Sequence, residues 1–377
     1  MALAYRIVFK CASRPVTVTI MMTKPSADAS MVALTRALSS ALTHALTHAL
    51  TSASKGTSKS TLKSTLKVKR VKMGLLNLVL VLLTSAANAA SEPPYLYILG
   101  VVQDAGYPQI GCYAVHCQPG WEQPQLRRGA TALGLIDPDV NKTYLFEATP
   151  NIGEQLYQLD QVAPASRYVQ GGIFLTHAHI GHYAGLMFLG QEAQGARHVP
   201  VYAMPRMLSY LNSNGPWSQL VTQQNILLQP LVADQAVALS RITVTPFLVP
   251  HRDEYSETVG YRITGPAKSA LFIPDINKWS DWSNDIKALV ETVDYALVDA
   301  TFYADGELPG RDMTKIPHPF VTETMTLFDD LALKHRQKIW FIHFNHTNPL
   351  LDPQSAASQA VRDKGFNIAQ EGIRLPL

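Results

Sequence analysis

The sequence has few cysteines and, after its first 89 residues, no excess of basic charge. Cysteine occurs three times in 377 residues, which excludes a small scaffold held together by many disulfides. Residues 1–89 contain 12 of the 32 Lys and Arg but only one acidic residue, Asp28, so residues 90–377 carry 20 basic and 28 acidic side chains, a net charge of −8. A nucleic-acid binder needs a basic face that neutralises phosphates. We therefore expect no nucleic-acid partner.

The sequence also lacks an apolar run long enough to span a bilayer comfortably. The apolar segment 74–87 is short for a transmembrane helix, and it lies between basic residues at 67–72 and the small residues Ala87 and Ala89. This order is typical of a secretory signal peptide. We predict a signal peptide over 73–89, with cleavage giving a periplasmic or secreted protein that has no stable membrane span. An uncleaved anchor is the alternative.

Residues 1–72 form a low-complexity leader. Ala-Leu-Thr-His recurs within 41–50, and Ser-Thr-Leu-Lys recurs within 60–67. Low complexity with almost no acidic residue fits an organelle transit peptide, but we favour a start codon assigned too early, with Met73 as the true first residue. The remaining segment, 90–377, is long enough to bury one large core.

Segments with strand and helix character are mixed throughout residues 90–377. No long Gly/Ser linker and no repeat interrupts them, which favours one layered α/β domain with sheets covered by helices. The strand-like runs cover 95–102, 132–136, 144–146, 172–175, 242–249, 258–263, 270–273, 295–298 and 339–342, and the helical patterns cover 152–159, 205–211, 321–333 and 353–363.

Titratable residues repeatedly follow these strand-like runs. They are His177, His251, Asp275, Asp299 and His343. Open α/β folds place ligands and chemistry at one edge of a sheet, where strands end. The pattern therefore predicts a functional site at such an edge.

Three histidines lie within the seven residues Thr176–His182, directly after a strand-like run. Buried imidazoles are costly unless they have polar partners, and imidazole nitrogen is a good ligand for Zn²⁺ and similar ions. The cluster predicts a metal centre, and a polar His-rich loop is the alternative interpretation.

This cluster resembles the H-x-H-x-D-H motif of the metallo-β-lactamase superfamily, and the resemblance extends along nearly all of residues 90–377. Val249–Arg252 is similar to the third-histidine segment of the ribonuclease Z and phosphodiesterase branches, Leu271–Asp275 to the strand ending in a bridging aspartate, and Trp340–His343 to the strand ending in the last histidine. Segments 98–100, 148–152, 298–302 and 345–349 look most like the pyrroloquinoline quinone biosynthesis protein B (PqqB) branch. The resemblance implies the α/β fold of this superfamily, a four-layer αβ/βα sandwich.

The resemblance also implies metal ligands. The first site would comprise His177, His179 and His251, Asp275 would bridge, and the second site would comprise His182 and His343. Gly181 stands where the motif has an aspartate, so a carboxylate ligand of the second ion is missing. We therefore expect one tightly bound Zn²⁺ and a second ion that is weaker or absent, and we expect Gly181→Asp to raise its occupancy.

Three further residues are predicted to support the ligands. Asp299 would lie at the site rim or hydrogen-bond a ligating histidine, unless it only caps a turn. Glu147 occupies a position that is often acidic in relatives and is expected to support the ligands structurally. His318 opens the predicted helix 321–333, where it would point toward the cleft or simply lie outside it.

Cys112, His116 and Cys117 allow two interpretations. The PqqB resemblance implies a structural zinc site to which all three would contribute, although a closely spaced third cysteine is absent. In an oxidising compartment the two cysteines would instead form a disulfide, which we favour.

The function implied is that of a zinc-dependent hydrolase acting on a small molecule. A metal-bound hydroxide would attack an ester, lactone, amide or phosphodiester, with Asp275 as the general base and His179 essential for catalysis. One alternative is a PqqB-like role in quinone cofactor biosynthesis, against which the predicted export argues. Another is a catalytically silent metal- or ligand-binding carrier, which Gly181 favours.

Overall fold

The computed structural model describes residues 3–11, 14–22 and 92–377, so the predicted signal peptide and most of the predicted leader lie outside the described residues. The chain divides into two compact units. In the first, strands β1 (Leu3–Cys11) and β2 (Arg14–Met22) form an antiparallel pair. The second unit, Ser91–Leu377, contains every other element described below.

One seven-stranded sheet contains the first half of this unit together with the last strand of the chain. Its order is β16-β3-β4-β5-β6-β7-β8, antiparallel from β16 to β5 and parallel from β5 to β8. The strands are β3 (Tyr95–Gly100), β4 (Ala132–Asp137), β5 (Lys142–Phe146), β6 (Val169–Phe174), β7 (Val199–Ala203), β8 (Ile226–Pro230) and β16 (Arg374–Pro376).

The second seven-stranded sheet has the order β15-β14-β13-β12-β11-β10-β9. Strands β12 to β15 are parallel, and β9 to β12 are antiparallel. The strands are β9 (Val237–Ala238), β10 (Thr243–Leu248), β11 (Val259–Thr264), β12 (Ser269–Ile273), β13 (Tyr295–Asp299), β14 (Ile339–Ile342) and β15 (Asn367–Ile368).

The two sheets pack face to face through a buried aromatic layer. Phe146 of the first sheet stacks on Phe174 at 5.1 Å between ring centroids and meets Tyr261 and Phe272 of the second sheet edge-on at 5.4 and 6.1 Å. Side chains alternate between the two faces of a strand, so Leu145 points to the opposite face, where it belongs to a second core cluster with Leu159 of a covering helix.

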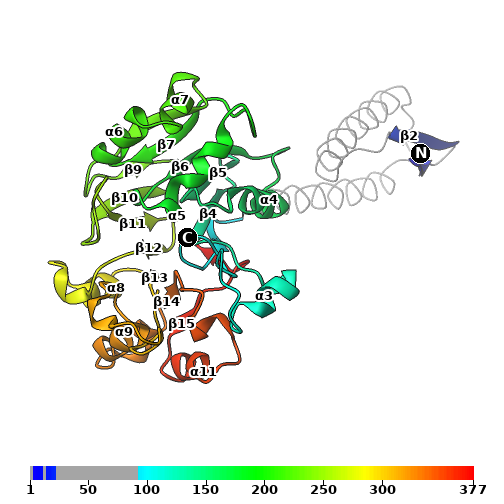
Figure 1. Cartoon of the computed structure of the whole chain (residues 1–377). Coiled ribbons are helices and arrows are strands. Elements are labelled where there is room, and N and C mark those ends of the chain that lie inside the picture. Colours follow the sequence, from blue (N-terminus) through cyan, green and yellow to red (C-terminus); the bar gives the residue numbers. More distant parts are fainter. Residues whose placement is uncertain (1–2, 12–13, 23–91) are drawn as a thin grey trace. The chain divides into compact units, whose positions relative to one another are not determined.

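Helices cover the outer faces of both sheets, as Figure 1 shows. They are α4 (Ile152–Val162), α6 (Pro205–Ser213) and α7 (Trp217–Thr222) on the first sheet, and α8 (Ile286–Glu291), α9 (Val321–Leu327) and α11 (Ala356–Asp363) on the second. This architecture confirms the predicted four-layer αβ/βα sandwich. In the part of the chain that the structure describes, no helix has both the length and the apolar character needed to cross a bilayer.

The helix predicted over 321–333 is wrong in its extent. Helix α9 ends at Leu327, and a separate short helix, α10, covers Leu333–Arg336. Between them, Asp329 contacts Lys364 at 3.1 Å and Asp330 contacts Lys287 at 2.7 Å. These contacts accompany the turn that separates the two helices.

Candidate metal centre

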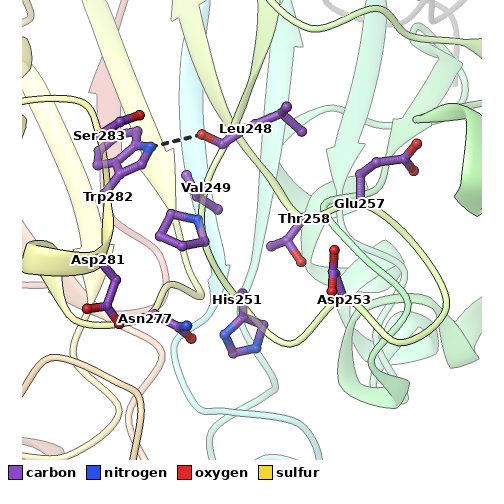
Figure 2. Close-up of a pocket in the computed structure, with 11 residues that line it drawn as sticks. Leu248, Val249, His251, Asp253, Glu257, Thr258, Asn277, Asp281, Trp282 and Ser283 are labelled. Atoms are coloured by element: carbon purple, nitrogen blue, oxygen red, sulfur yellow. Dashed lines mark hydrogen bonds between the residues drawn. The ribbon is translucent and has the colours of Figure 1, made fainter.

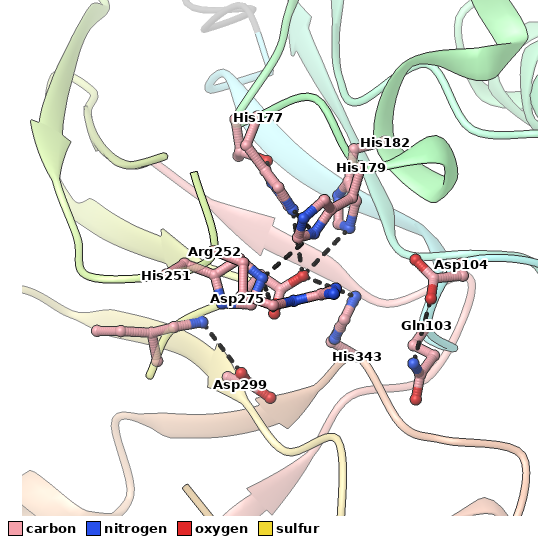
Figure 3. A network of polar contacts seen from close by, with 12 residues as sticks. Gln103, Asp104, His177, His179, His182, His251, Arg252, Asp275, Asp299 and His343 are labelled. Atoms are coloured by element: carbon pink, nitrogen blue, oxygen red, sulfur yellow. Dashed lines mark hydrogen bonds and ion pairs between the residues drawn. The ribbon is translucent and has the colours of Figure 1, made fainter. Parts of the chain in front are cut away.

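The carboxyl ends of strands from both sheets deliver histidine and aspartate side chains to one place. His177 follows β6 of the first sheet, whereas His251, Asp275 and His343 follow β10, β12 and β14 of the second. His182 lies on the short helix α5 (Ile180–Tyr183), which begins directly after the first two histidines. Figure 3 shows these side chains converging around Asp275. The structure therefore brings together all six residues predicted to ligate metal.

The first ligand set consists of His177, His179, His251 and Asp275, whose ligand atoms lie within 4.8 Å of one another. His251 Nε2 is 3.3 Å from His179 Nδ1 and 3.3 Å from Asp275 Oδ1, and His177 Nε2 is 3.4 Å from Asp275 Oδ2. Ligands about 2.0–2.1 Å from a tetrahedral zinc lie about 3.3 Å apart. The separation of His177 Nε2 from His179 Nδ1, at 2.8 Å, is shorter. The set can therefore hold one zinc ion, on which a bound water would be a fifth ligand.

Asp275 is shared with the remaining histidines. Its Oδ2 lies 3.5 Å from His182 Nε2 and 3.8 Å from His343 Nε2, while its Oδ1 lies 3.2 Å from His318 Nδ1. Burial by itself would raise the pKa of Asp275, but the surrounding histidines hold this pKa well below its ordinary value. Asp275 is therefore an ionised, buried carboxylate, as a bridging ligand requires.

The second ligand set consists of Asp104, His182 and His343, whose ligand atoms also lie within 4.8 Å of one another. Nε2 of both histidines is buried and has no hydrogen-bond partner among the residues that the structure describes. The sequence analysis missed Asp104, although a usable signal existed, because Gln103-Asp104 directly follows the strand-like run 95–102.

Hydroxyl groups orient one histidine in each ligand set. Thr176 Oγ1 lies 2.9 Å from His177 Nδ1, and Thr301 Oγ1 lies 3.0 Å from His343 Nδ1. Thr301 also donates a 2.7 Å hydrogen bond to Asp299 Oδ1, so its hydroxyl oxygen accepts from His343. This arrangement leaves Nε2 of each histidine directed at the centre, which is the usual role of an outer partner of a metal-binding imidazole.

Asp299 caps the turn after β13 and contacts His318 rather than a residue of either ligand set. It is fully buried rather than at the rim, and it accepts hydrogen bonds from the backbone amides of Ile276 and Thr301, at 3.1 and 2.9 Å. Its Oδ2 also lies 2.8 Å from His318 Nδ1. The carboxylates of Asp299 and Asp275 outweigh the effect of burial on His318 and raise its pKa to about 9.

Glu147 contacts the second ligand set from behind, as predicted. Its Oε1 lies 3.4 Å from His182 Nδ1. Burial would lower the pKa of His182, but Glu147 and Asp275 outweigh it and raise this pKa to about 10.

Glu147 and His343 both have positive φ, 78° and 70°, which costs backbone energy in a residue other than glycine. Such strain is concentrated in functional sites.

The exposed side of the first ligand set has a partner that the sequence analysis missed. Glu254 Oε2 lies 3.3 Å from His179 Nε2, the ring nitrogen that points away from the other ligands.

Burial lowers the pKa of His179, and it lowers the pKa of His251 to about 4. Both imidazoles are therefore neutral near pH 7, the form that binds a metal.

The cysteine pair lies in a separate loop. Cys112 and Cys117 form a disulfide, which is the alternative that we favoured. His116 Nε2 lies 3.5 Å from Cys112 Sγ, and the His116 ring is 5.5 Å from that of His346. The three residues of the predicted zinc alternative are thus neighbours, but the sulfurs of Cys112 and Cys117 are bonded to each other and not to a metal.

A cavity of about 470 Å³ opens beside His251. Figure 2 shows its walls, which include Trp282 and Asn277 on one side and Asp253 and Thr258 on the other. This volume suits a small-molecule ligand. Of the first ligand set only His251 lines this cavity, and the His251 side chain has no exposed surface.

Comparison with known proteins agrees with this geometry. A family profile described as the β-lactamase superfamily domain matches residues 142–344, which include His177, Asp275 and His343. The chain belongs to this superfamily, and its sandwich is the metallo-β-lactamase fold.

Within the superfamily the chain is PqqB-like. The coenzyme PQQ synthesis protein B of Methylobacterium sp. (strain 4-46) is 26% identical over 306 residues, covering 74% of this chain and 99% of the relative. A crystal structure of Zn²⁺-bound PqqB from Methylobacterium extorquens superposes with a TM-score of 0.64 at 23% identity, covering 75% of this chain and all of that one. A diphosphatase of the PhnP family superposes with a TM-score of 0.52 at 21% identity, covering 76% and 100%. At these identities the solved structures support the fold.

Proposed function

We propose that the protein is a zinc-dependent hydrolase of small molecules. The observation that carries the proposal is the first ligand set, in which the ligand atoms of three imidazoles and a carboxylate lie within 4.8 Å of one another, and of which His251 also lines a cavity. These residues would hold a zinc ion, which would lower the pKa of a bound water to about 7 and polarise the bond under attack. The Zn²⁺-bound PqqB is a related protein whose ion supports the same choice of metal.

The chain's own residues orient the reaction. Asp275 is ionised and faces the interior of the cluster, so its carboxylate accepts the proton of the attacking water. His318 contacts both Asp275 Oδ1 and Asp299 Oδ2, and it therefore fixes the direction of the Asp275 carboxylate. Glu254 fixes the ring of His179 in the same way.

The cavity favours a neutral substrate. The charged side chains that line it are the acids Asp253, Glu257 and Asp281, of which Asp253 pairs with Arg206 at 3.4 Å. Such walls repel an anionic phosphodiester, whereas an ester, lactone or amide carries no charge at its reactive bond. We therefore rank the neutral acyl compounds above phosphodiesters among the predicted substrates.

Hydrolysis assays test this proposal. Purified protein would be assayed with zinc against aryl esters, lactones, amides and a bis-aryl phosphodiester, and we expect turnover of at least one neutral compound. His179→Ala should reduce that turnover by at least about 100-fold. Loss of an outer hydrogen-bond partner of a metal ligand already costs up to about 100-fold, and loss of the ligand itself should cost more. His198→Asn, which changes an exposed histidine outside the cluster, is the control. Turnover unaffected by His179→Ala would refute the proposal.

A second candidate function is a role in quinone cofactor biosynthesis, favoured by the similarity to the coenzyme PQQ synthesis protein along 99% of its length. It predicts that this chain restores PQQ production in a bacterium that lacks its own PqqB. Stoichiometric ligand binding with neither restoration nor turnover would instead indicate a carrier, the alternative suggested by Gly181.

We also propose that the protein acts in the periplasm or outside the cell. Support comes from the signal-peptide pattern at 73–89 and from the disulfide between Cys112 and Cys117, because disulfides persist in oxidising compartments. Cell fractionation tests this, together with sequencing of the mature N-terminus, which we expect at Ala90. Full-length protein in the cytoplasm would contradict it.

A further inference from the structure

The glycine in the histidine motif is matched by an aspartate from a distant part of the chain. A Cβ atom added to Gly181 would lie 2.3 Å from the Cα and 2.6 Å from the Oδ1 of Asp104. In an aspartate, bond lengths put a carboxylate oxygen about 2.4 Å from its own Cβ. Oδ1 of Asp104 therefore lies about as far from the Cβ position of residue 181 as the carboxylate oxygen of an aspartate at 181 would lie.

The carboxylate of Asp104 faces two histidines whose Nε2 atoms make no hydrogen bond among the described residues. Its ligand atom lies within 4.8 Å of those of His182 and His343, and Nε2 of both rings is buried without a hydrogen-bond partner among the described residues. Asp275 Oδ2 completes the group at 3.5 Å from His182 and 3.8 Å from His343. Figure 3 shows Asp104 beside His182 and His343, on the opposite side of the cluster from His251.

The position of Asp104 is fixed by the segment that follows β14 and contains His343. The Gln103 amide donates to the Phe344 carbonyl at 2.9 Å, and the Phe344 amide donates to the Val101 carbonyl at 2.8 Å. Asp104 has φ of +44°, a conformation that aspartate tolerates better than most residues. Its Oδ2 accepts a 3.2 Å hydrogen bond from the Gln103 side chain.

We propose that Asp104 is the carboxylate ligand of a second metal ion, bound together with His182, His343 and the shared Asp275, and that it replaces the aspartate absent at Gly181. The proposal rests on the proposed function only in taking the cluster to bind zinc. It reverses the expectation of a weak second site, which followed from the missing motif carboxylate. It also explains the glycine, since any side chain at 181 would collide with the Asp104 backbone.

Zinc counting on purified, dialysed full chain tests the proposal, with competition against a chelator to give the affinity of each ion. We expect two zinc ions in the wild type. Asp104→Asn removes the charge and keeps the side-chain shape, and it should weaken the second ion by at least about 10-fold while leaving the first unchanged. Asp281→Asn removes an acid from the cavity wall and should keep both ions.

A carboxylate exchange provides a second test. Gly181→Asp alone should fail to gain an ion because its side chain meets the Asp104 backbone. The double variant Asp104→Gly/Gly181→Asp keeps the Cα of residue 104, which lies 2.3 Å from the added Cβ, so it should not regain the second ion that Asp104→Asn loses. Where a variant unfolds, as judged by circular dichroism, the affinities of Asp104→Asn decide.

The outcomes separate this proposal from the hydrolase proposal. A wild type with one tight ion, or an Asp104→Asn protein with both ions at unchanged affinity, would overturn the role of Asp104 even if the protein hydrolyses substrate. Loss of one ion in Asp104→Asn would support that role even if no compound in the panel is hydrolysed.

Discussion

The two ligand sets of this centre are drawn from the sequence in different ways. In the first set, two of the four ligands, His177 and His179, come from one short loop that a linear motif describes well. In the second set, no two of Asp104, His182 and His343 come from the same segment, and the motif contains only His182. The comparison teaches that a residue missing from a motif does not imply a chemical group missing from the folded site.

Removing the residue that both sets share should have the largest effect. Asp275→Asn should abolish tight binding of both ions and, in the metal-free protein, lower the free energy of unfolding by about 3–5 kcal/mol, because it leaves buried groups without their charged partner. Zinc counting and urea unfolding measure the two effects. If one set kept its ion at wild-type affinity, Asp275 would not be shared.

Removing one histidine from each set should separate them. His177→Ala should abolish tight binding of the first ion and reduce hydrolysis by at least about 100-fold, whereas His182→Ala should reduce the affinity for the second ion by a comparable factor and leave the first bound. Chelator competition on both variants provides the comparison. Identical losses from both variants would mean that the sets bind as one unit.

Removing the outer hydroxyl of each set should give a smaller effect of the same kind. Thr176→Val removes the partner of His177, and Thr301→Val removes the partner of His343. Each should weaken its own ion by about 10–100-fold, because the ring loses its fixed orientation. Each variant is the control for the other, since Thr176→Val should leave the affinity for the second ion unchanged and Thr301→Val should leave the affinity for the first ion unchanged. A crossed effect would contradict the assignment of ligands.

The smallest effect is expected at the exposed side of the first set. Glu254→Gln keeps a hydrogen-bond acceptor near His179 Nε2 but removes the charge from a half-exposed side chain. We expect the first ion to weaken by less than about 10-fold, with the second ion unaffected. An effect as large as that of Thr176→Val would show that Glu254 is held more rigidly than its exposure suggests.

The strand-end rule explains what the sequence could predict of the site. His251, Asp275 and His343 follow apolar runs that form strands β10, β12 and β14, so their convergence follows from the sheet. Asp104 obeys the same rule, since it follows the run that becomes β3. It was not predicted because the hydrogen bonds that join its segment to Phe344 are not visible in the sequence.

The fold was predictable where long apolar runs form the strands. Strands β7 and β8, which contain Pro200 and Pro230, were not predicted, whereas β10 was predicted although it contains Pro246. The contacts of Glu254 and Thr176 could not be predicted, because they depend on loop conformations and ring orientations that arise only after the sheets pack.

The ladder between Val101 and Phe344 has a consequence for biosynthesis. It joins residues 243 positions apart, and it holds the loop that carries Asp104. A nascent chain that has not yet been translated to Phe344 has neither this ladder nor His343. If the site binds two ions as proposed, its complete set of ligands is therefore in place only after translation has passed Phe344 and the two ends of the sandwich have met.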